Sequence, residues 1–246
     1  MNWQRTPLAV LSTFAAMLAA LSGCTPQIYS PPASPVLLES SATVGKARTA
    51  AFANAGGHGA LFGPEVVAGQ GGLRVGVGDD VGLSATGSTL VALGGESGDP
   101  HPGAYALRLG AKYTPIEHLA VVGGVGGGRS AAGGFASPDV GVIGSYENPY
   151  VVPFVGMRAL LSQPIRAVTI AIQDGDEQAR LTPRTTLGGQ FSFGARVPLG
   201  PRGSAPAQRG SLLCAGTLTM LADSRQHDTF TGLQCGAELK WGGSEE

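Results

Sequence analysis

Apolar and polar residues alternate one by one along most of the chain. The stretch 229–241 shows the pattern clearly, with Leu239 and Trp241 at odd positions and Glu238 and Lys240 at even positions. A period of two is typical of a β-strand that has one apolar face and one polar face. The recurrence of this pattern predicts an all-β protein.

Ten segments with this alternation predict ten strands. Their approximate bounds are 43–54, 65–77, 81–92, 104–113, 119–128, 138–146, 150–162, 185–197, 211–222 and 229–241. Most of these lengths suit strands that cross a bilayer at a tilt. The alternative count is eight strands.

The predicted connections alternate in length. Short connections with turn-forming residues fall at 78–80, 114–118 and 147–149, and longer ones at 93–103, 129–137 and 163–184. The connections 199–210 and 223–228 depart from this rule. Short turns on one rim and long loops on the other are typical of outer-membrane barrels.

The alternation alone leaves open which face is inside. A soluble sandwich, a lipocalin-like barrel or a lipid-tethered periplasmic β-domain would bury the apolar face. The connection lengths favour a membrane barrel with the apolar face outward, and so do Tyr113, Tyr146, Tyr150 and Trp241 near strand ends, where an interfacial aromatic belt forms. Over residues 43–241 the chain resembles small outer-membrane β-barrel proteins, a resemblance of architecture that implies no activity.

Composition adds little about function. The 40 glycines fall largely within the alternating segments, and the net charge of −1 gives no case for a nucleic-acid partner. No run after Cys24 has the apolar length of a spanning helix, so strands would have to cross a bilayer as a closed barrel.

The first 24 residues have the pattern of a secretory signal, with Arg5 before an apolar run at 8–21. The run ends in Leu21-Ser22-Gly23-Cys24, which resembles the lipobox of bacterial lipoproteins. That resemblance implies cleavage before Cys24, a diacylglycerol on its thiol and an acylated amine, and Thr25 in place of Asp favours the outer membrane. The predicted divisions are a signal peptide at 1–23, a lipidated N-terminus and flexible tether at 24–42, and a barrel at 43–246. Both ends of an even-stranded barrel lie on the short-turn side, so the tether is expected to begin there.

The polar face is mainly basic. A barrel with its apolar face outward would turn these cations into its lumen, where they would form a narrow path for anions or fill the space themselves. The basic residues expected in the lumen are Arg48, Arg74, Arg108, Lys112, Arg158, Arg196 and Lys240.

Cys214 and Cys235 stand on the last two predicted strands. In a hairpin centred between Ser224 and Arg225 they are directly opposite and share a face. Opposed residues approach closely enough for a disulfide, and the expected compartment is oxidising. The alternative is two free thiols that face lipid.

The connection 163–184 contains its own strand pattern. Asp174-Gly175 is a hairpin turn signal, and Val168, Ile170 and Ile172 would share one face of a projecting hairpin. An exposed apolar strand can pair with a partner, although the hairpin could instead fold back onto the barrel mouth.

These patterns predict a non-enzymatic, lipid-anchored outer-membrane barrel whose loops face the cell exterior. It would contact outer-membrane lipid and other envelope proteins in a secretion, adhesion or motility assembly. No metal site, cofactor site or catalytic residue is predicted. The alternatives are a narrow anion-permeable channel and a lipid-modifying enzyme that uses loop histidines at the outer rim.

Overall fold

A computed structural model describes residues 29–60, 65–93, 101–168, 170–174, 177–199, 209–224 and 227–242. Within these ranges the regular elements are strands. They are β1 (Arg48–Ala60), β2 (Glu65–Gly76), β3 (Val81–Leu93), β4 (His101–Ile116), β5 (Leu119–Ser130), β6 (Gly133–Ser145), β7 (Val152–Ala167), β8 (Ile170–Asp174), β9 (Glu177–Leu181), β10 (Thr186–Leu199), β11 (Arg209–Ala222) and β12 (His227–Gly242). None of the described residues forms a helix able to cross a membrane.

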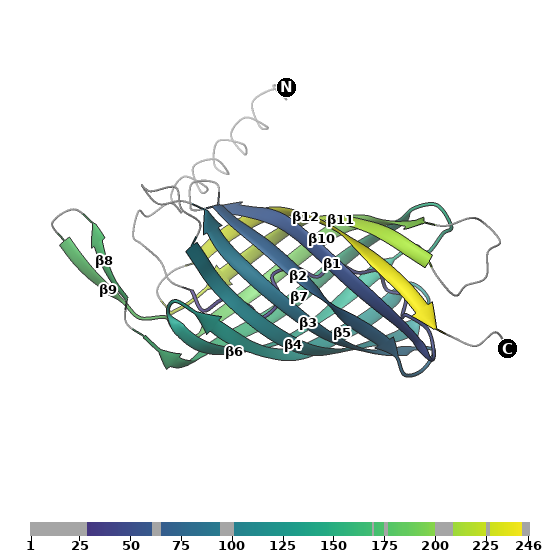
Figure 1. Cartoon of the computed structure of the whole chain (residues 1–246), viewed down its shortest axis with the longest axis horizontal. Helices are drawn as coiled ribbons and strands as arrows, with labels where there is room; N and C mark the ends of the chain where they lie inside the picture. The colour runs from purple at the N-terminus through teal and green to yellow at the C-terminus, as the bar shows by residue number, and fades with distance from the viewer. Residues whose placement is uncertain are drawn as a thin grey trace, which may run out of the picture.

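Ten strands close into one antiparallel barrel in the order β1-β12-β11-β10-β7-β6-β5-β4-β3-β2 (Figure 1). The first and last strands complete the cylinder, with Arg48 opposite Gly242 at one end and Ala60 opposite Phe230 at the other. This arrangement confirms the predicted all-β barrel and its ten strands rather than eight. The remaining strands, β8 and β9, pair only with each other, in a separate two-stranded sheet.

The barrel has two rims. We call the rim with the start of β1 and the end of β12 the short-turn rim; its connections are 77–80, 117–118, 146–151 and 200–208. We call the other rim the long-loop rim; its connections are 61–64, 94–100, 131–132, 168–185 and 223–226. The predicted loop at 129–137 is wrong, because β5 and β6 extend into it and leave a connection of two residues.

The barrel has its apolar face outward. On β2, Leu73 and Val75 are exposed, whereas Gln70 and Arg74 point inward and are largely buried. The same alternation continues around the wall, so the exterior offers an apolar band to lipid and the interior is polar. Around the short-turn rim the exterior carries exposed aromatic side chains, as the sequence predicts: Tyr113, Tyr146, Tyr150 and Trp241. These faces define a transmembrane β-barrel.

The first strand differs from its prediction of 43–54. It begins at Arg48 because residues 43–47 make a turn, with positive φ at Gly45 and Ala47. Within the turn, the Arg48 amide donates to the Gly45 carbonyl at 3.2 Å and the Ala47 amide donates to the Gly76 carbonyl at 3.1 Å. The strand then continues to Ala60 through glycine-rich sequence that the pattern did not mark as a strand.

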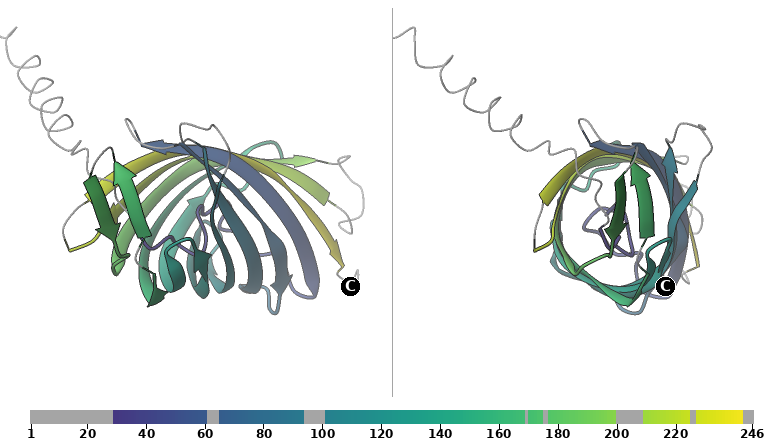
Figure 2. Two further views of the ribbon diagram at one scale, coloured as in Figure 1. Left: turned by 60° about the vertical axis from the view of Figure 1, so that its left-hand side comes forward. Right: turned by 90° about the vertical axis from the view of Figure 1, so that its left-hand side faces the viewer.

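The largest difference concerns the segment that leads into this turn. Residues 30–44, predicted to belong mainly to a flexible tether on the short-turn side, lie inside the barrel, where Figure 2 shows their purple trace. Ser41 is fully buried, and Ala33 and Val36 each expose 1% of their surface. We call residues 30–44 the luminal segment.

Candidate functional site: the occupied lumen

The luminal segment crosses the barrel once, from rim to rim. At the long-loop rim, Tyr29 forms a β-bridge with Arg184, and its ring meets that of Phe230 edge-on at 6.5 Å between centroids. Burial and the nearby carboxylates of Asp228 and Asp223 raise the pKa of Tyr29. At the short-turn rim, the Thr43 hydroxyl donates to the Asp79 carbonyl at 2.6 Å. The chain therefore enters the lumen at the long-loop rim and leaves it at the short-turn rim.

Side chains of the wall satisfy the backbone carbonyls of this segment. Arg158 Nη2 donates to the Ser34 carbonyl at 2.6 Å, and Gln190 Nε2 donates to the Pro35 carbonyl at 2.6 Å. The accepting carbonyls belong to Pro31, Ala33, Ser34, Pro35, Val36, Leu38, Ser40, Ser41 and Ala42. Their donors are Ser162, Ser88, Arg158, Gln190, Gln70, Arg74, Lys112 and Thr114. Buried carbonyls need such partners, and this segment forms no strand or helix that would supply them.

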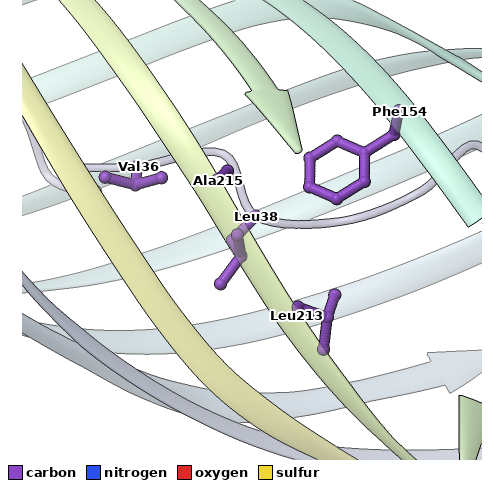
Figure 3. Packing of buried hydrophobic residues seen from close by; sticks show 5 residues of the cluster. All are labelled: Val36, Leu38, Phe154, Leu213 and Ala215. Atoms are coloured by element: carbon purple, nitrogen blue, oxygen red, sulfur yellow. The ribbon is translucent and has the colours of Figure 1, made fainter. Parts of the chain in front are cut away.

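Apolar side chains anchor the segment in three clusters. Figure 3 shows the first, where Val36 and Leu38 of the segment lie near Phe154 on β7 and near Leu213 and Ala215 on β11. The second places Leu37 against Ala120, Val122 and Ile143, and the third places Ala33 against Ala104, Ala106 and Phe135. The segment thus contacts opposite sides of the wall.

Ion pairs surround the part of the segment nearest the short-turn rim. Glu39, within the segment, accepts from Lys112 at 2.6 Å and lies 3.7 Å from Arg74 Nε. Arg74 also pairs with Glu238 and stacks over the ring of Phe52 at 4.2 Å from its centroid. The cavity left in this network has a volume of about 10 Å³, close to the minimum that one water molecule needs.

Three other predicted lumen cations, Arg108, Arg196 and Lys240, have specific partners. Arg108 forms a bidentate pair with Asp139, with both N–O distances at 2.6 Å. Arg196 Nη2 lies 2.5 Å from Glu147, and Lys240 Nζ lies 3.5 Å from Glu238. Arg48, at the start of β1, is half-buried at the short-turn rim.

Sequence reasoning placed Arg74, Arg108, Lys112, Arg158, Arg196 and Lys240 on the inner face, where the structure has them. It missed two of the acids that pair with them. Glu147 was assigned to a short turn and Glu39 to the tether, so the lumen is less cationic than predicted. One signal was available, because Val36, Leu37 and Leu38 are an unusual run for a solvated tether.

The predicted disulfide is present between Cys214 and Cys235. The two residues are paired across β11 and β12, with 4.1 Å between their Cα atoms. Both residues are on the exterior. The bond therefore lies outside the lumen and links the last two strands.

The predicted hairpin is also present. β8 and β9 pair from Ile170 opposite Leu181 to Asp174 opposite Glu177, and they project beyond the long-loop rim (Figure 1). Before the hairpin, Ile165 and Val168 are exposed by 66% and 53%. The side chains of Ile170 and Ile172, and all of Cys24, lie outside what the structure describes.

The histidines considered for catalysis are dispersed. His58 is within β1 opposite Gly232, not in an outer loop, and His101 and His227 begin β4 and β12. Among the described residues there is no group of three or more His, Cys, Asp or Glu side chains placed to hold a metal ion.

Comparison with known proteins gives likenesses of fold only. No protein-family model and no curated protein matches the chain. Several solved structures do match. The β domain of the Bordetella autotransporter BrkA has 13% sequence identity and a TM-score of 0.42, and the match covers 80% of this chain and 100% of that one. The outer-membrane protease OmpT of Escherichia coli has 12% identity and a TM-score of 0.40, and the match covers 80% of this chain and 97% of that one. Neisserial surface protein A also matches, with 12% identity and a TM-score of 0.37, over 80% of this chain and 96% of that one. At this similarity the class of the chain, a transmembrane β-barrel, is established by its own strand order and faces.

Proposed function

We propose that this protein is a lipid-anchored outer-membrane β-barrel without enzymatic activity. In this proposal Cys24 carries the lipid, the long-loop rim faces the cell exterior, and that rim binds another envelope protein in a secretion, adhesion or motility assembly. The observation that carries the proposal is the occupied lumen. Because the chain's own segment fills the barrel, the surface left for a partner is the exterior and its rims.

The alternative of a narrow anion-permeable channel draws on the basic wall. Five of the cations that would line such a path, Arg74, Arg108, Lys112, Arg196 and Lys240, are ion-paired. Arg158 instead donates to a carbonyl of the luminal segment. These contacts favour a closed barrel in the resting state.

The projecting hairpin supports a role in binding. A two-stranded sheet is at best marginally stable by itself, and both outer edges of β8–β9 lack a neighbouring strand among the described residues. Unpaired edges can accept a strand from another protein. Exposed Ile165 and Val168 extend the apolar surface at the base of the hairpin.

Localisation and anchoring are tested together. We expect the protein from outer-membrane fractions to migrate faster on gels when unheated than when boiled, as a folded barrel does. Mass spectrometry of the mature N-terminal peptide should show acylated Cys24, and Cys24→Ala should remain in the membrane through its barrel. If gel mobility does not change on heating, and Cys24→Ala is released into the soluble fraction, the protein would instead be a tethered periplasmic domain.

Partner binding is tested at the hairpin. Envelope proteins cross-linked to the wild type in intact cells should be lost from a variant with Ile170→Asp and Ile172→Asp. The matched control changes the intervening positions of the same strand, Ala171→Asp and Gln173→Asp. Equal loss in both variants, or retention in both, contradicts recognition through the predicted apolar face.

A further inference from the structure

We propose that the chain threads its own lumen so that a lipid on Cys24 lies at the long-loop rim, in the outer leaflet of the membrane. The inference rests on the proposed lipidation and orientation, but the threading itself stands on contacts within the described residues. It reverses the usual expectation that such an anchor sits in the inner leaflet, beside the rim where β1 begins.

The direction of threading follows from contacts at the two ends of the lumen. Near the long-loop rim, Ser30 Oγ lies 2.9 Å from Ser162 Oγ, and the Ser30 amide donates to Thr186 Oγ1 at 3.2 Å. Near the short-turn rim, Ser41 Oγ lies 2.6 Å from Ser145 Oγ, and the Ser41 amide donates to the same oxygen at 3.0 Å.

Chain length then restricts Cys24. The 14 residue steps from Tyr29 to Thr43 span about 43 Å in an extended conformation, enough for one passage through the membrane. Only five steps separate Tyr29 from Cys24, and they reach at most about 17 Å. The hydrocarbon core is about 30 Å thick, so Cys24 cannot return to the short-turn side while Tyr29 stays where it is.

The luminal contacts hold Tyr29 in place. Nine carbonyls of the segment accept hydrogen bonds from the wall, and its apolar side chains lie in three buried clusters. Glu39 is paired with Lys112 and Arg74. Withdrawal of the segment would leave these buried groups without partners, which is costly in a low-dielectric interior. The wall is therefore complementary to this segment in this direction.

The exit point gives the anchor a function. A lipid held beside the long loops would draw that rim towards the outer leaflet, and the hairpin β8–β9 projects from the same rim. The site proposed to bind a partner and the lipid would then share one side of the membrane.

Paired cysteines test the threading. Ser30→Cys with Ser162→Cys and Ser41→Cys with Ser145→Cys should form disulfides in the folded protein, because each pair replaces side-chain oxygens already in contact. The mismatched pairs, Ser30→Cys with Ser145→Cys and Ser41→Cys with Ser162→Cys, are controls of identical chemistry. We expect at least tenfold more cross-linking in the matched pairs. Cross-linking in the mismatched pairs, or in none of the four while the barrel remains heat-modifiable, would overturn the threading.

Labelling of intact cells with a membrane-impermeant maleimide tests the side of the membrane. Gln27→Cys, between Cys24 and Tyr29, is compared with Gln173→Cys in the hairpin and Asp80→Cys in a short turn. We expect the first two to react in intact cells and Asp80→Cys only after lysis. If Gln27→Cys, like Asp80→Cys, reacts only after lysis while Gln173→Cys reacts in intact cells, the proposal is overturned. If Gln27→Cys and Gln173→Cys both require lysis, the lipid cannot be in the outer leaflet.

These outcomes separate this inference from the proposed function. If Cys24 is unmodified but Ser30→Cys and Ser162→Cys cross-link efficiently, the proposed lipidation is wrong and the threading stands. An acylated Cys24 with cross-linking only in the mismatched pairs would keep the lipoprotein and remove its outer-leaflet position.

Discussion

Arg158 of β7 donates a hydrogen bond from Nη2 to the Ser34 carbonyl at 2.6 Å, and from the same nitrogen to Gln190 Oε1 at 2.8 Å. Gln190 in turn donates to the Pro35 carbonyl at 2.6 Å and accepts from the Leu37 amide at 3.3 Å. Two wall side chains thereby bind the backbone of the luminal segment at Ser34, Pro35 and Leu37. The lumen is organised around a peptide rather than around an aqueous path.

Removal of Arg158 should weaken this connection. Arg158→Ala leaves the Ser34 carbonyl and Gln190 without a buried charged partner, at a cost of about 1–3 kcal/mol in the free energy of unfolding. The expected result is a lower midpoint of urea unfolding in lipid vesicles. Arg166→Ala is the matched control because Arg166 is on the same strand and exposed, and it should change the midpoint little. Equal effects would contradict the role of Arg158 in holding the segment.

Gly156 provides a test of packing in the lumen. A Cβ at this position would lie 3.3 Å from Leu37 Cδ2 and 2.7 Å from Ser192 Oγ, so Gly156→Leu should push the segment away from the wall. Chymotrypsin should then cleave after Leu37 or Leu38, bonds that the wild type protects. At Gly189, on the exterior, a Cβ meets nothing within 4 Å, so Gly189→Leu should keep the protection.

Replacement of the luminal segment should open the barrel. In a variant with residues 30–42 exchanged for a Gly-Ser sequence of equal length, the wall loses its contacts with Glu39 and with the apolar side chains of the segment. We expect the wild type to be silent in planar bilayers. The variant should conduct with a preference for anions, because Lys112 and Arg158 lose their partners in the segment and stay on the wall. A wild type with steady conductance would contradict the closed lumen.

The disulfide should be detectable by thiol labelling and by its contribution to thermal stability. Unfolded protein should take up maleimide at Cys214 and Cys235 only after reduction. Cys214→Ser with Cys235→Ser should lower the temperature at which gel mobility changes, since a closed loop of this length contributes up to about 3 kcal/mol. Labelling of both thiols without reductant would show that the bond is absent in cells.

Much of the barrel could be predicted from the sequence because its faces are set locally. Leu73 and Arg74 are adjacent, so a strand that buries one must expose the other, and turn residues then fix the register of neighbouring strands. The same logic gave the pairing of Cys214 with Cys235 and the hairpin around Asp174-Gly175. Errors occurred where glycines weaken the alternation, at the end of β1 and in the connection 131–132.

The luminal segment could not be predicted in this way. Pro31, Pro32 and Pro35 indicate an extended chain, and an extended chain has the same local sequence in solvent as in a lumen. The position of Glu39 depends on Lys112 and Arg74, which are far away in sequence and meet only when the barrel closes. Long-range complementarity of this kind leaves no periodic signal.

The closure of β1 against β12 has a consequence for assembly. β1 follows directly from the luminal segment, and β12 is the last strand of the barrel to be synthesised. When Arg48 meets Gly242 and Ala60 meets Phe230, the cylinder closes around residues 30–44. If Cys24 carries the proposed lipid, that group could not later be drawn through a lumen that this segment already fills. On that proposal, the segment enters the lumen before β1 and β12 pair, and it is a template around which the wall is built.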